Sequence, residues 1–462
     1  LTLTNAFVIP QAKSFEFIGS GGGKLSLTEK MTLTGTLKTS SPNYIIDGST
    51  LVLNGGKLEI DQNTSISSSF VNAASSEIKI SNGKTLTYSG SALDLGTYPL
   101  KLSGGGVLAN SSDLRLNDPS SILNLDGIGE LAKLSFPTSL NNTGILNVVK
   151  GAKIDNLTHV GESRINISDG ETLLISGDVS VGSNKKMELN GAGGTLKLGN
   201  KLILSGTLNL EKKTTLESGT IAFDGGIISV KDNSTISSAI VHDDSSTFEI
   251  SSGKALTIRT DFSVPENLKM SLTGDGGVLN LENTVTLSGT MEFNVEHNLD
   301  NGTLNLNGGT LSIKDDVTIS SSIVHVKDST IDISTSSTLT HTGGDLKTGG
   351  KTLTFSGSGN FSNTDKVVLD DPEGVLKFSG NSTVGNVSVP VKQSTGKLDV
   401  DENTVVQNFF HGGSSRLDIL FGKNLTVTNG FEVPQTKSME LIGTGGVLNL
   451  SDNLTLSGTL KF

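Results

Sequence analysis

Four of the six histidines in this chain recur at nearly constant intervals. His159, His242, His325 and His411 are separated by 83, 83 and 86 residues, and Asn72 occupies the corresponding position nearer the amino terminus. Imidazole is a frequent metal ligand and a general base near neutral pH. The spacing therefore raises the question of a metal or catalytic site, and the answer depends on how far apart the fold holds these side chains.

The histidine interval is also the period of the whole chain. A strand pattern that opens with a leucine recurs at Leu1, Leu86, Leu173, Leu256, Leu339 and Leu425. These starts define modules 1–85, 86–172, 173–255, 256–338, 339–424 and an incomplete module 425–462. Self-similarity at a fixed period is typical of solenoids and arrays. We therefore expect one continuous solenoid segment over residues 1–462, taken from a longer chain.

Each module is itself internally repeated. The run GGVLNLENTVTLSGTM at 276–291 aligns with GGTLSIKDDVTISSSI at 308–323, and STIDISTSSTLTHT at 329–342 follows. Strict alternation of apolar and polar residues between Gly, Asn and Asp predicts half-buried strands, and no helical stripe is present. The pattern predicts an all-β solenoid with about 21 residues per coil, about four coils per module, and a rise of about 4.8 Å per coil.

This coil geometry decides how the recurring histidines are interpreted. Four coils separate successive histidines by about 19 Å, which is too far for them to share a metal ion. Their neighbours also differ, with Asp243 and Asp244 after His242 but Gly412 and Gly413 after His411. We interpret the four histidines as repeat-equivalent polar positions of unknown role, placed in a turn or lining a groove.

Acidic turns are the second candidate for metal chemistry. They recur as Asp61-Gln62-Asn63, Lys231-Asp232-Asn233, Lys314-Asp315-Asp316 and Asp401-Glu402-Asn403. Calcium sites need several oxygen ligands that converge on one loop, and neither the EF-hand spacing nor the glycine–aspartate nonapeptide is present. Asp and Asn form turns through bonds to the local backbone. The sequence thus predicts turns here, with no metal and no cofactor.

An enzymatic interpretation finds little support in the sequence. The best catalytic candidates are Asp243 and Asp244 beside His242. Polysaccharide-cleaving β-helices gather acid and base groups in one exposed cluster, and no non-repeated cluster of that kind stands out here. The loops are also short. We therefore predict no catalytic residues and a protein that is not an enzyme.

Composition narrows the environment and the partners. The chain has no cysteine, 4% aromatic residues and a net charge of −12. Disulfides and thiolate metal sites are therefore excluded. An acidic surface repels nucleic acid and anionic lipid, and no apolar run is long enough to span a bilayer as a helix. We expect neither nucleic-acid binding nor membrane insertion of this segment.

Two proline-containing turns suggest a longer repeat. Asp118-Pro119-Ser120 and Asp371-Pro372-Glu373 lie 253 residues apart and replace the LSGTL run found in the other modules. This spacing corresponds to three modules. It leads to the hypothesis that part of the chain arose by duplication of a three-module block.

Runs such as NGGTLSIKDDVTISSS and GGVLNLSDNLTLSGTL occur along the whole chain and carry a family resemblance. The chain resembles the β-helical passenger and stalk regions of autotransporter-like and filamentous-haemagglutinin-like secreted bacterial adhesins. The recurring tetrapeptides of the chlamydial polymorphic outer-membrane family are missing. The resemblance implies a right-handed parallel β-helix, export to the cell exterior, and an adhesive or structural role. It carries over no functional residue.

Three functional hypotheses follow. The first is a structural extracellular solenoid, a repeat segment of a giant bacterial surface adhesin or fibre that acts as a stalk or self-assembles. Its partners would be other copies, cell-surface or matrix components, or glycans. The second is a carbohydrate-active β-helix lyase or hydrolase, and the third is a trimeric fibre of the phage-tail type.

Overall fold

The computed structural model of the protein describes residues 1–137, 143–390 and 396–462, which form 60 strands and no helix. The strand pairings that define its sheets are parallel and join strands from successive coils, as in Leu102 opposite Leu125 and Leu189 opposite Leu210. In the fourth module Leu272 pairs with Phe293 of the next coil in the same way. The predicted all-β solenoid and its predicted coil length are confirmed.

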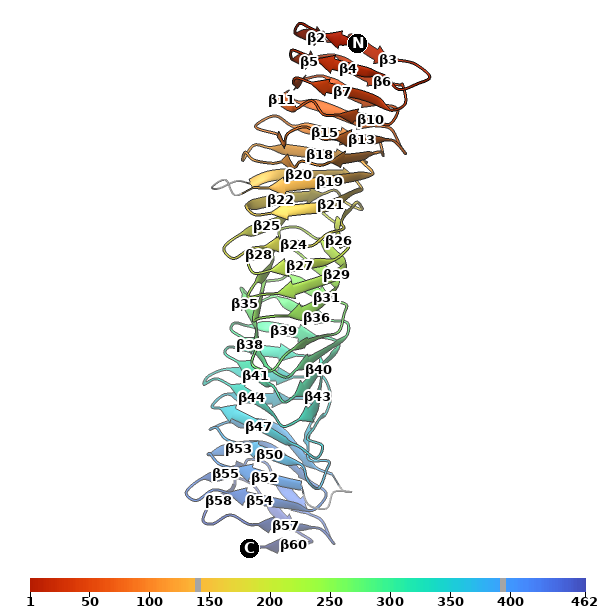
Figure 1. Ribbon diagram of the computed structural model, residues 1–462. Coiled ribbons are helices and arrows are strands. Elements are labelled where there is room, and N and C mark those ends of the chain that lie inside the picture. The colour runs from red at the N-terminus through yellow and green to blue at the C-terminus, as the bar shows by residue number, and fades with distance from the viewer. Residues whose placement is uncertain (138–142, 391–395) are drawn as a thin grey trace. The chain divides into compact units, whose positions relative to one another are not determined.

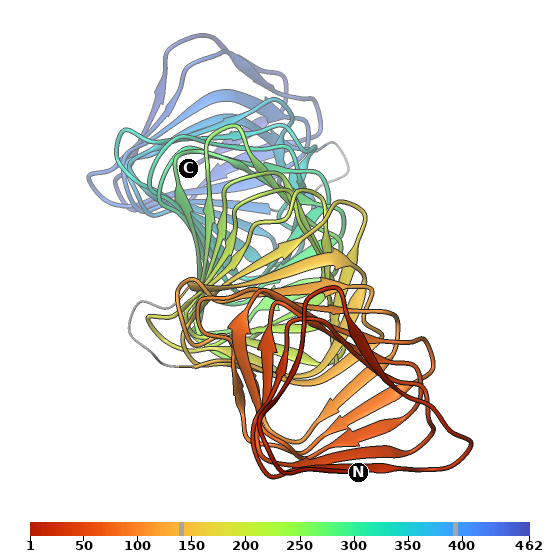
Figure 2. The same ribbon diagram turned by 90° about the horizontal axis from the view of Figure 1, so that it is seen from above.

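The chain divides into two compact units, Leu1–Ala239 and Ile240–Phe462, called units 1 and 2 below. In each unit a coil runs through three faces, named A, B and C, and Figure 1 shows the strands of successive coils following one another along each unit. Figure 2 shows the coils end-on. Strand β31 (Ser234–His242) contains the boundary between the units.

Most strands of unit 1 are short. Strands β19, β21 and β29 are longer, because each continues from face A into face B. Face A contains β1 (Thr2–Leu3), β4 (Lys24–Leu27), β7 (Tyr44–Gly48), β10 (Thr64–Ile66), β13 (Thr85–Tyr88), β16 (Val107–Asn110), β19 (Glu130–Phe136), β21 (Ala152–His159), β23 (Thr172–Ile175), β26 (Thr195–Leu198) and β29 (Thr215–Phe223). Face B contains β2 (Phe7–Ile9), β5 (Met31–Leu33), β8 (Leu51–Asn54), β11 (Phe70–Ala74), β14 (Leu93–Asp94), β17 (Leu114–Arg115), β24 (Val179–Val181) and β27 (Lys201–Leu204). Face C contains β3 (Ser14–Phe17), β6 (Thr36–Thr39), β9 (Lys57–Ile60), β12 (Ser76–Ile80), β15 (Leu100–Ser103), β18 (Ile122–Asp126), β20 (Thr143–Lys150), β22 (Glu162–Ile167), β25 (Lys186–Leu189), β28 (Thr207–Leu210) and β30 (Ile227–Val230).

Unit 2 repeats this arrangement, with β51 and β53 as its long strands. Face A contains β33 (Ala255–Ile258), β36 (Val278–Leu281), β39 (His297–Asp300), β42 (Val317–Ile319), β45 (Thr338–His341), β48 (Asn360–Asn363), β51 (Thr383–Val389), β53 (Thr404–His411), β55 (Asn424–Val427) and β58 (Val447–Leu450). Face B contains β34 (Phe262–Val264), β37 (Thr284–Leu287), β40 (Thr303–Asn307), β43 (Ser322–Lys327), β46 (Leu346–Lys347), β49 (Val367–Val368), β56 (Phe431–Val433) and β59 (Leu454–Leu456). Face C contains β32 (Ser246–Ile250), β35 (Lys269–Gly274), β38 (Thr290–Phe293), β41 (Thr310–Ile313), β44 (Ser329–Ile333), β47 (Thr352–Gly357), β50 (Val375–Phe378), β52 (Gly396–Val400), β54 (Ser415–Ile419), β57 (Ser438–Leu441) and β60 (Thr459–Lys461).

The core of each unit is built from columns of like residues. On face C of unit 1, one register row is fully buried and consists of Leu37, Leu58, Ile78, Leu102 and Leu125. Burying such a side chain stabilises the fold by about 1.5–3 kcal/mol relative to leaving it exposed. Because a coil has only one or two inward residues per strand, a coil depends on its neighbours to complete this column.

A glycine in the LSGTL run lets neighbouring coils approach closely. A Cβ on Gly206 would collide with the carbonyl oxygens of Gly182 and Lys185 in the preceding coil. Gly289 faces the carbonyls of Pro265 and Leu268 in the same way. The backbone N–H of Gly206 donates to the Val181 carbonyl at 2.8 Å. The repeated glycine therefore reflects backbone contact between coils at this corner.

Two buried asparagines tie neighbouring coils together through identical bonds. The Asn110 amide donates to the carbonyls of Ser112 and Lys133 at 2.8 and 2.7 Å, and its oxygen accepts the Lys133 N–H at 3.1 Å. Asn363, three modules further along the chain, bonds Asp365 and Asn386 at 2.7, 2.9 and 2.8 Å in the same way. This recurrence supports the hypothesis of a duplicated three-module block.

Replacing Asn363 by Ala is expected to lower the free energy of unfolding by about 1–3 kcal/mol, because the backbone N–H and carbonyl of Asn386 lose the hydrogen bonds to Asn363, whereas the Asp365 carbonyl keeps one from the Asn386 amide. Urea denaturation followed by circular dichroism measures the loss. Asn110→Ala is the matched variant in unit 1 and should cost a similar amount. Exposed Asn381→Ala is the control. Equal stability of N363A and N381A would show that the network contributes nothing.

Candidate functional site

The recurring histidines lie mostly inside the coils. His159, His242 and His411 end β21, β31 and β53 and are 7%, 6% and 5% exposed. Placing them in a turn or groove is therefore wrong for these three, because the alternation along the strand points their rings inward. His325, within β43, is half-buried and its Nδ1 lies 2.8 Å from the Thr348 carbonyl oxygen.

A serine four residues after the histidine completes this position. Nε2 of His242 lies 2.9 Å from Oγ of Ser246, and Nε2 of His411 lies 2.9 Å from Oγ of Ser415. The serines open β32 and β54 and are 3% exposed. Histidine and serine thus join the two strands that flank the corner between faces B and C. Both groups are shielded from solvent, so the pair positions the corner and cannot present a nucleophile to a substrate.

The same burial changes the proton affinity of these rings. Desolvation lowers the pKa of His159, His242 and His411 to about 4. It also lowers the pKa of His297 and His341, which are 1% exposed. All five rings are therefore neutral at pH 7.

The acidic candidates near His242 face away from it. Asp243 and Asp244 are exposed, whereas the His242 ring is buried. Oδ1 of Asp244 accepts the N–H of Ser245 at 2.6 Å, which is a local turn bond. Within residues 1–137, 143–390 and 396–462, no three His, Asp or Glu side chains are grouped so that they could hold a metal ion.

The acidic turns connect one coil to the next. The side-chain oxygens of Asn63, Asp316 and Asn403 accept backbone N–H groups of the following coil at 2.9, 2.8 and 2.9 Å. Within the turns, Asp232 and Asp315 each accept the N–H of the following residue. The prediction that these residues act as turn formers is confirmed. The turns also connect each coil to the next through these hydrogen bonds.

The outward side of face C in unit 1 carries rows of alternating charge. One register row reads Glu16, Lys38, Glu59 and Lys79 on successive coils. Nζ of Lys79 lies 2.7 Å from Oε1 of Glu59, and this hydrogen bond lowers the pKa of the Glu59 carboxyl. Like charges directly opposite each other would destabilise the stack, so alternation favours this register.

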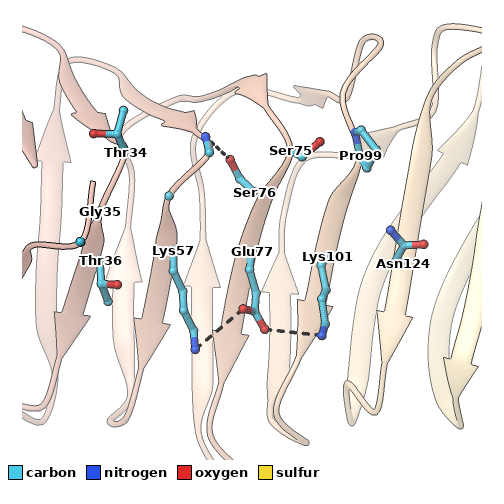
Figure 3. A pocket seen from close by; sticks show the side chains of 13 residues that line it. Thr34, Gly35, Thr36, Lys57, Ser75, Ser76, Glu77, Pro99, Lys101 and Asn124 are labelled. Atoms are coloured by element: carbon cyan, nitrogen blue, oxygen red, sulfur yellow. Dashed lines mark hydrogen bonds and ion pairs between the residues drawn. The ribbon is translucent and has the colours of Figure 1, made fainter. Parts of the chain in front are cut away.

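The neighbouring row lies beside a groove. It contains Lys57, Glu77 and Lys101 on β9, β12 and β15, followed by Asn124 on β18. Figure 3 shows Lys57 and Lys101 reaching toward Glu77 from either side, with Nζ–O distances of 3.8 and 4.0 Å. Nζ of Lys101 also lies 2.8 Å from Asp126, and this bond raises the pKa of Lys101.

The groove follows the corner between faces B and C of unit 1 and encloses about 420 Å³. Its wall on the side of face B carries hydroxyl groups and exposed backbone, as Figure 3 shows. The lining residues there are Thr34, Gly35, Gly55, Gly56, Ser75 and Pro99, and Thr36 and Ser76 line the groove from the first positions of β6 and β12. The result is an open, polar trough that runs across successive coils.

Comparison with protein-family models, with curated proteins and with solved structures finds no match to this chain. In the described part of the chain, no helix is long and apolar enough to cross a membrane. The groove residues therefore have to be interpreted from their geometry alone.

Sequence reasoning missed the charge rows and the groove. The charges that meet across coils lie a full coil apart in sequence, as with Lys57, Glu77 and Lys101. Scanning the sequence at the coil period would have brought Lys57 close to Glu77, but Lys101 is further along the chain than one such period, so its place in the row needs the structure. The serine position also had a signal, since Ser163, Ser246, Ser329 and Ser415 each follow a recurring histidine by four positions, although among these described residues the hydrogen bond forms only in the pairs His242–Ser246 and His411–Ser415.

Proposed function

We propose that this chain is a structural extracellular β-solenoid, a repeat segment of a bacterial surface adhesin or fibre. The observation that carries the proposal is the coil-to-coil ladder. Buried columns such as Leu37 to Leu125, cross-coil asparagines and paired charge rows all join each coil to its neighbours. Together with the continuous backbone hydrogen bonds between parallel strands, these side-chain interactions make the stacked coils a stiff scaffold.

Charge distribution is in keeping with an exposed surface. Unit 1 holds 20 Lys and Arg against 21 Asp and Glu, a net charge of −1, and unit 2 holds 15 against 26, a net charge of −11. An acidic surface favours solubility and resists nonspecific contact with polyanions. The proposal assigns no catalysis to the groove, because Glu77 is the only carboxylate that lines it and glycoside hydrolysis commonly uses two.

Exposure on the cell surface is tested by antibody labelling and protease shaving of intact cells that produce the protein. We expect an antibody raised against residues 1–462 to label unpermeabilised cells, and mild proteinase K treatment to release the signal. A cytoplasmic protein of the same cells serves as the control for lysis. Labelling that needs permeabilised cells would contradict the proposal.

A variant of the proposal has the solenoid associate with other copies as a filament. Light scattering coupled to gel filtration of the purified chain separates this variant from a simple stalk. A single species near the chain mass of 48.0 kDa across a concentration series would contradict the filament and leave the stalk in place.

A further inference from the structure

The corner groove of unit 1 is built on one residue per coil. Thr36, Lys57, Glu77, Lys101 and Asn124 form one in-register row on β6, β9, β12, β15 and β18. With neighbouring strands about 4.8 Å apart, these five coils extend about 20 Å along the stacking direction. From this geometry we propose that the groove binds a neutral polysaccharide chain that lies along the stack.

Unit 2 shows what the same row looks like without charges. The equivalent row contains Thr290, Thr310, Thr330 and Thr354 on β38, β41, β44 and β47. Thr310, Thr330 and Thr354 stand three modules after Lys57, Glu77 and Lys101. A groove of about 360 Å³ lies at this corner too, and its lining includes Ser288, Asn307 and Gly308 together with Glu266 and Lys327, which lie outside the row. The coils therefore stack without the charged triad.

Stability does not account for the triad in unit 1. The side chains of Lys57, Glu77 and Lys101 are 31%, 29% and 43% exposed, and both lysine–glutamate distances are near the limit for an ion pair. Pairs this exposed contribute about 0–1 kcal/mol. Lys101 also pairs with Asp126 at 2.8 Å and Lys57 with Glu59 at 3.7 Å, and each ammonium group, with three N–H donors, keeps donor capacity beyond these contacts. The triad thus adds binding capacity to a scaffold that is already stable.

The chemistry of the row matches a neutral polyol. The lysines and the Asn124 amide group donate, glutamate accepts, and the Thr36 hydroxyl can do both, so the groove offers alternating partners to sugar hydroxyls, which also donate and accept. A polyanion would meet Glu77 at the centre of the row, and the charge of Lys101 is already balanced by Asp126 at 2.8 Å. A peptide laid across the coils would find every strand edge already paired in the parallel ladder.

A polymer suits this groove better than a single sugar. One polar side chain is available at each coil step, so successive units of an extended chain would meet successive coils. No aromatic residue lines the groove, so stacking on a ring does not contribute and each contact is weak. Affinity would come from many contacts along one polymer.

Affinity electrophoresis of the purified full chain tests the proposal. Native gels are cast with dextran, a mannan, a galactan or a β-glucan as neutral polymers, and with alginate as an acidic one. At least one neutral polymer is expected to retard the chain. The triple variant K57T/E77T/K101T, which copies the residues of unit 2, should bind that polymer at least tenfold more weakly.

The control variant R164T/K186T/E188T removes the same charges from face C away from the groove. Arg164 and Lys186 pair with Glu188 at 2.9 and 2.6 Å on β22 and β25. This variant should be retarded like the unmodified chain, and circular dichroism checks that both variants fold. The proposal is overturned if no neutral polymer in the panel retards the chain, or if alginate is the only polymer that does. It is also overturned if the groove variant binds the neutral polymer as well as the control variant does. The groove would bind glycan wherever the chain is located, so these outcomes are independent of the surface-labelling test.

Discussion

Lowering the pH from 7 to 4.5 is expected to destabilise unit 2 more than unit 1. Unit 2 contains four histidines whose pKa is lowered by burial, His242, His297, His341 and His411, whereas unit 1 contains only His159. Buried neutral rings must either remain unprotonated or leave the core when the solution becomes acidic. The fold is therefore tied to the neutral form of these side chains.

The sign of the effect follows from proton linkage. Above pH 6.5 the folded and unfolded states both hold neutral histidine, so these groups leave stability unchanged. Between pH 6.5 and about 4 the unfolded chain binds protons that the folded chain does not, and stability falls by about 1.4 kcal/mol per pH unit for each histidine. At pH 4 this amounts to roughly 3 kcal/mol each for His159, His242 and His411.

Nearby charges change the pKa values of these histidines only slightly. Asp243 lies near His242 and Asp365 lies near His341, and each raises the histidine pKa slightly against the larger effect of burial. Lys185 acts in the opposite direction on His159. Carboxylates with a lowered pKa, such as Glu59 and Asp126 in unit 1, begin to lose their stabilising effect as the pH falls below their ordinary pKa values of 4.5 and 3.8, outside the range from pH 7 to 4.5.

Amide hydrogen exchange between pH 7 and pH 4.5, corrected for the intrinsic exchange rate, measures the effect unit by unit. Exchange should accelerate over residues 240–462 before it does so over residues 1–239. His411→Asn is the informative variant, because Asn72 occupies the same module position and donates to the carbonyls of Leu95 and Tyr98 at 3.1 and 2.6 Å. The variant should lose less stability than the original chain on acidification. A pH-independent exchange pattern above pH 4.5 would refute this account.

Gly206→Ala is expected to destabilise the coils around β28 by at least about 3 kcal/mol. The added methyl group would collide with two backbone carbonyl oxygens, those of Gly182 and Lys185, which cannot rotate away as a side chain would. Overpacking against fixed backbone forces the coils apart and weakens the bond from the Gly206 N–H to the Val181 carbonyl.

Gly182→Ala is the matched control in the preceding coil. Its Cβ would meet only Cγ of Lys185 at 3.9 Å, an ordinary contact. Proline occupies the corresponding position as Pro10, Pro265 and Pro434, so this site tolerates a side chain. Because alanine reduces the entropy of the unfolded chain, G182A should be neutral or more stable by about 0.5 kcal/mol. Urea denaturation and hydrogen exchange over residues 179–230 compare the two, and equal stability of both variants would contradict the close-approach explanation.

The sequence by itself determined the fold class and the coil length. Alternation such as Val278-Leu279-Asn280-Leu281 is a local signal, since the strand geometry sends successive side chains to opposite faces. Turn residues such as Asn63 and Asp316 were also predictable, because a turn depends on a few neighbouring residues.

The inward position of His159, His242 and His411 was not predictable in the same way. Each lies at a strand end, where a shift of one residue exchanges the core side for the solvent side. The partner serine across the corner and the paired strand fix this choice for His242 and His411, and the paired strand does so for His159; these contacts belong to the tertiary structure.

Only the tertiary structure decided which side chains meet across coils. The step in sequence between paired positions is longer from Ile78 to Leu102 than from Leu146 to Ile165. A single fixed coil period therefore pairs some positions with the wrong partner. The register comes from the packing of the buried columns and from the turn lengths together, and the row of Lys57, Glu77 and Lys101 exists only once that register is set.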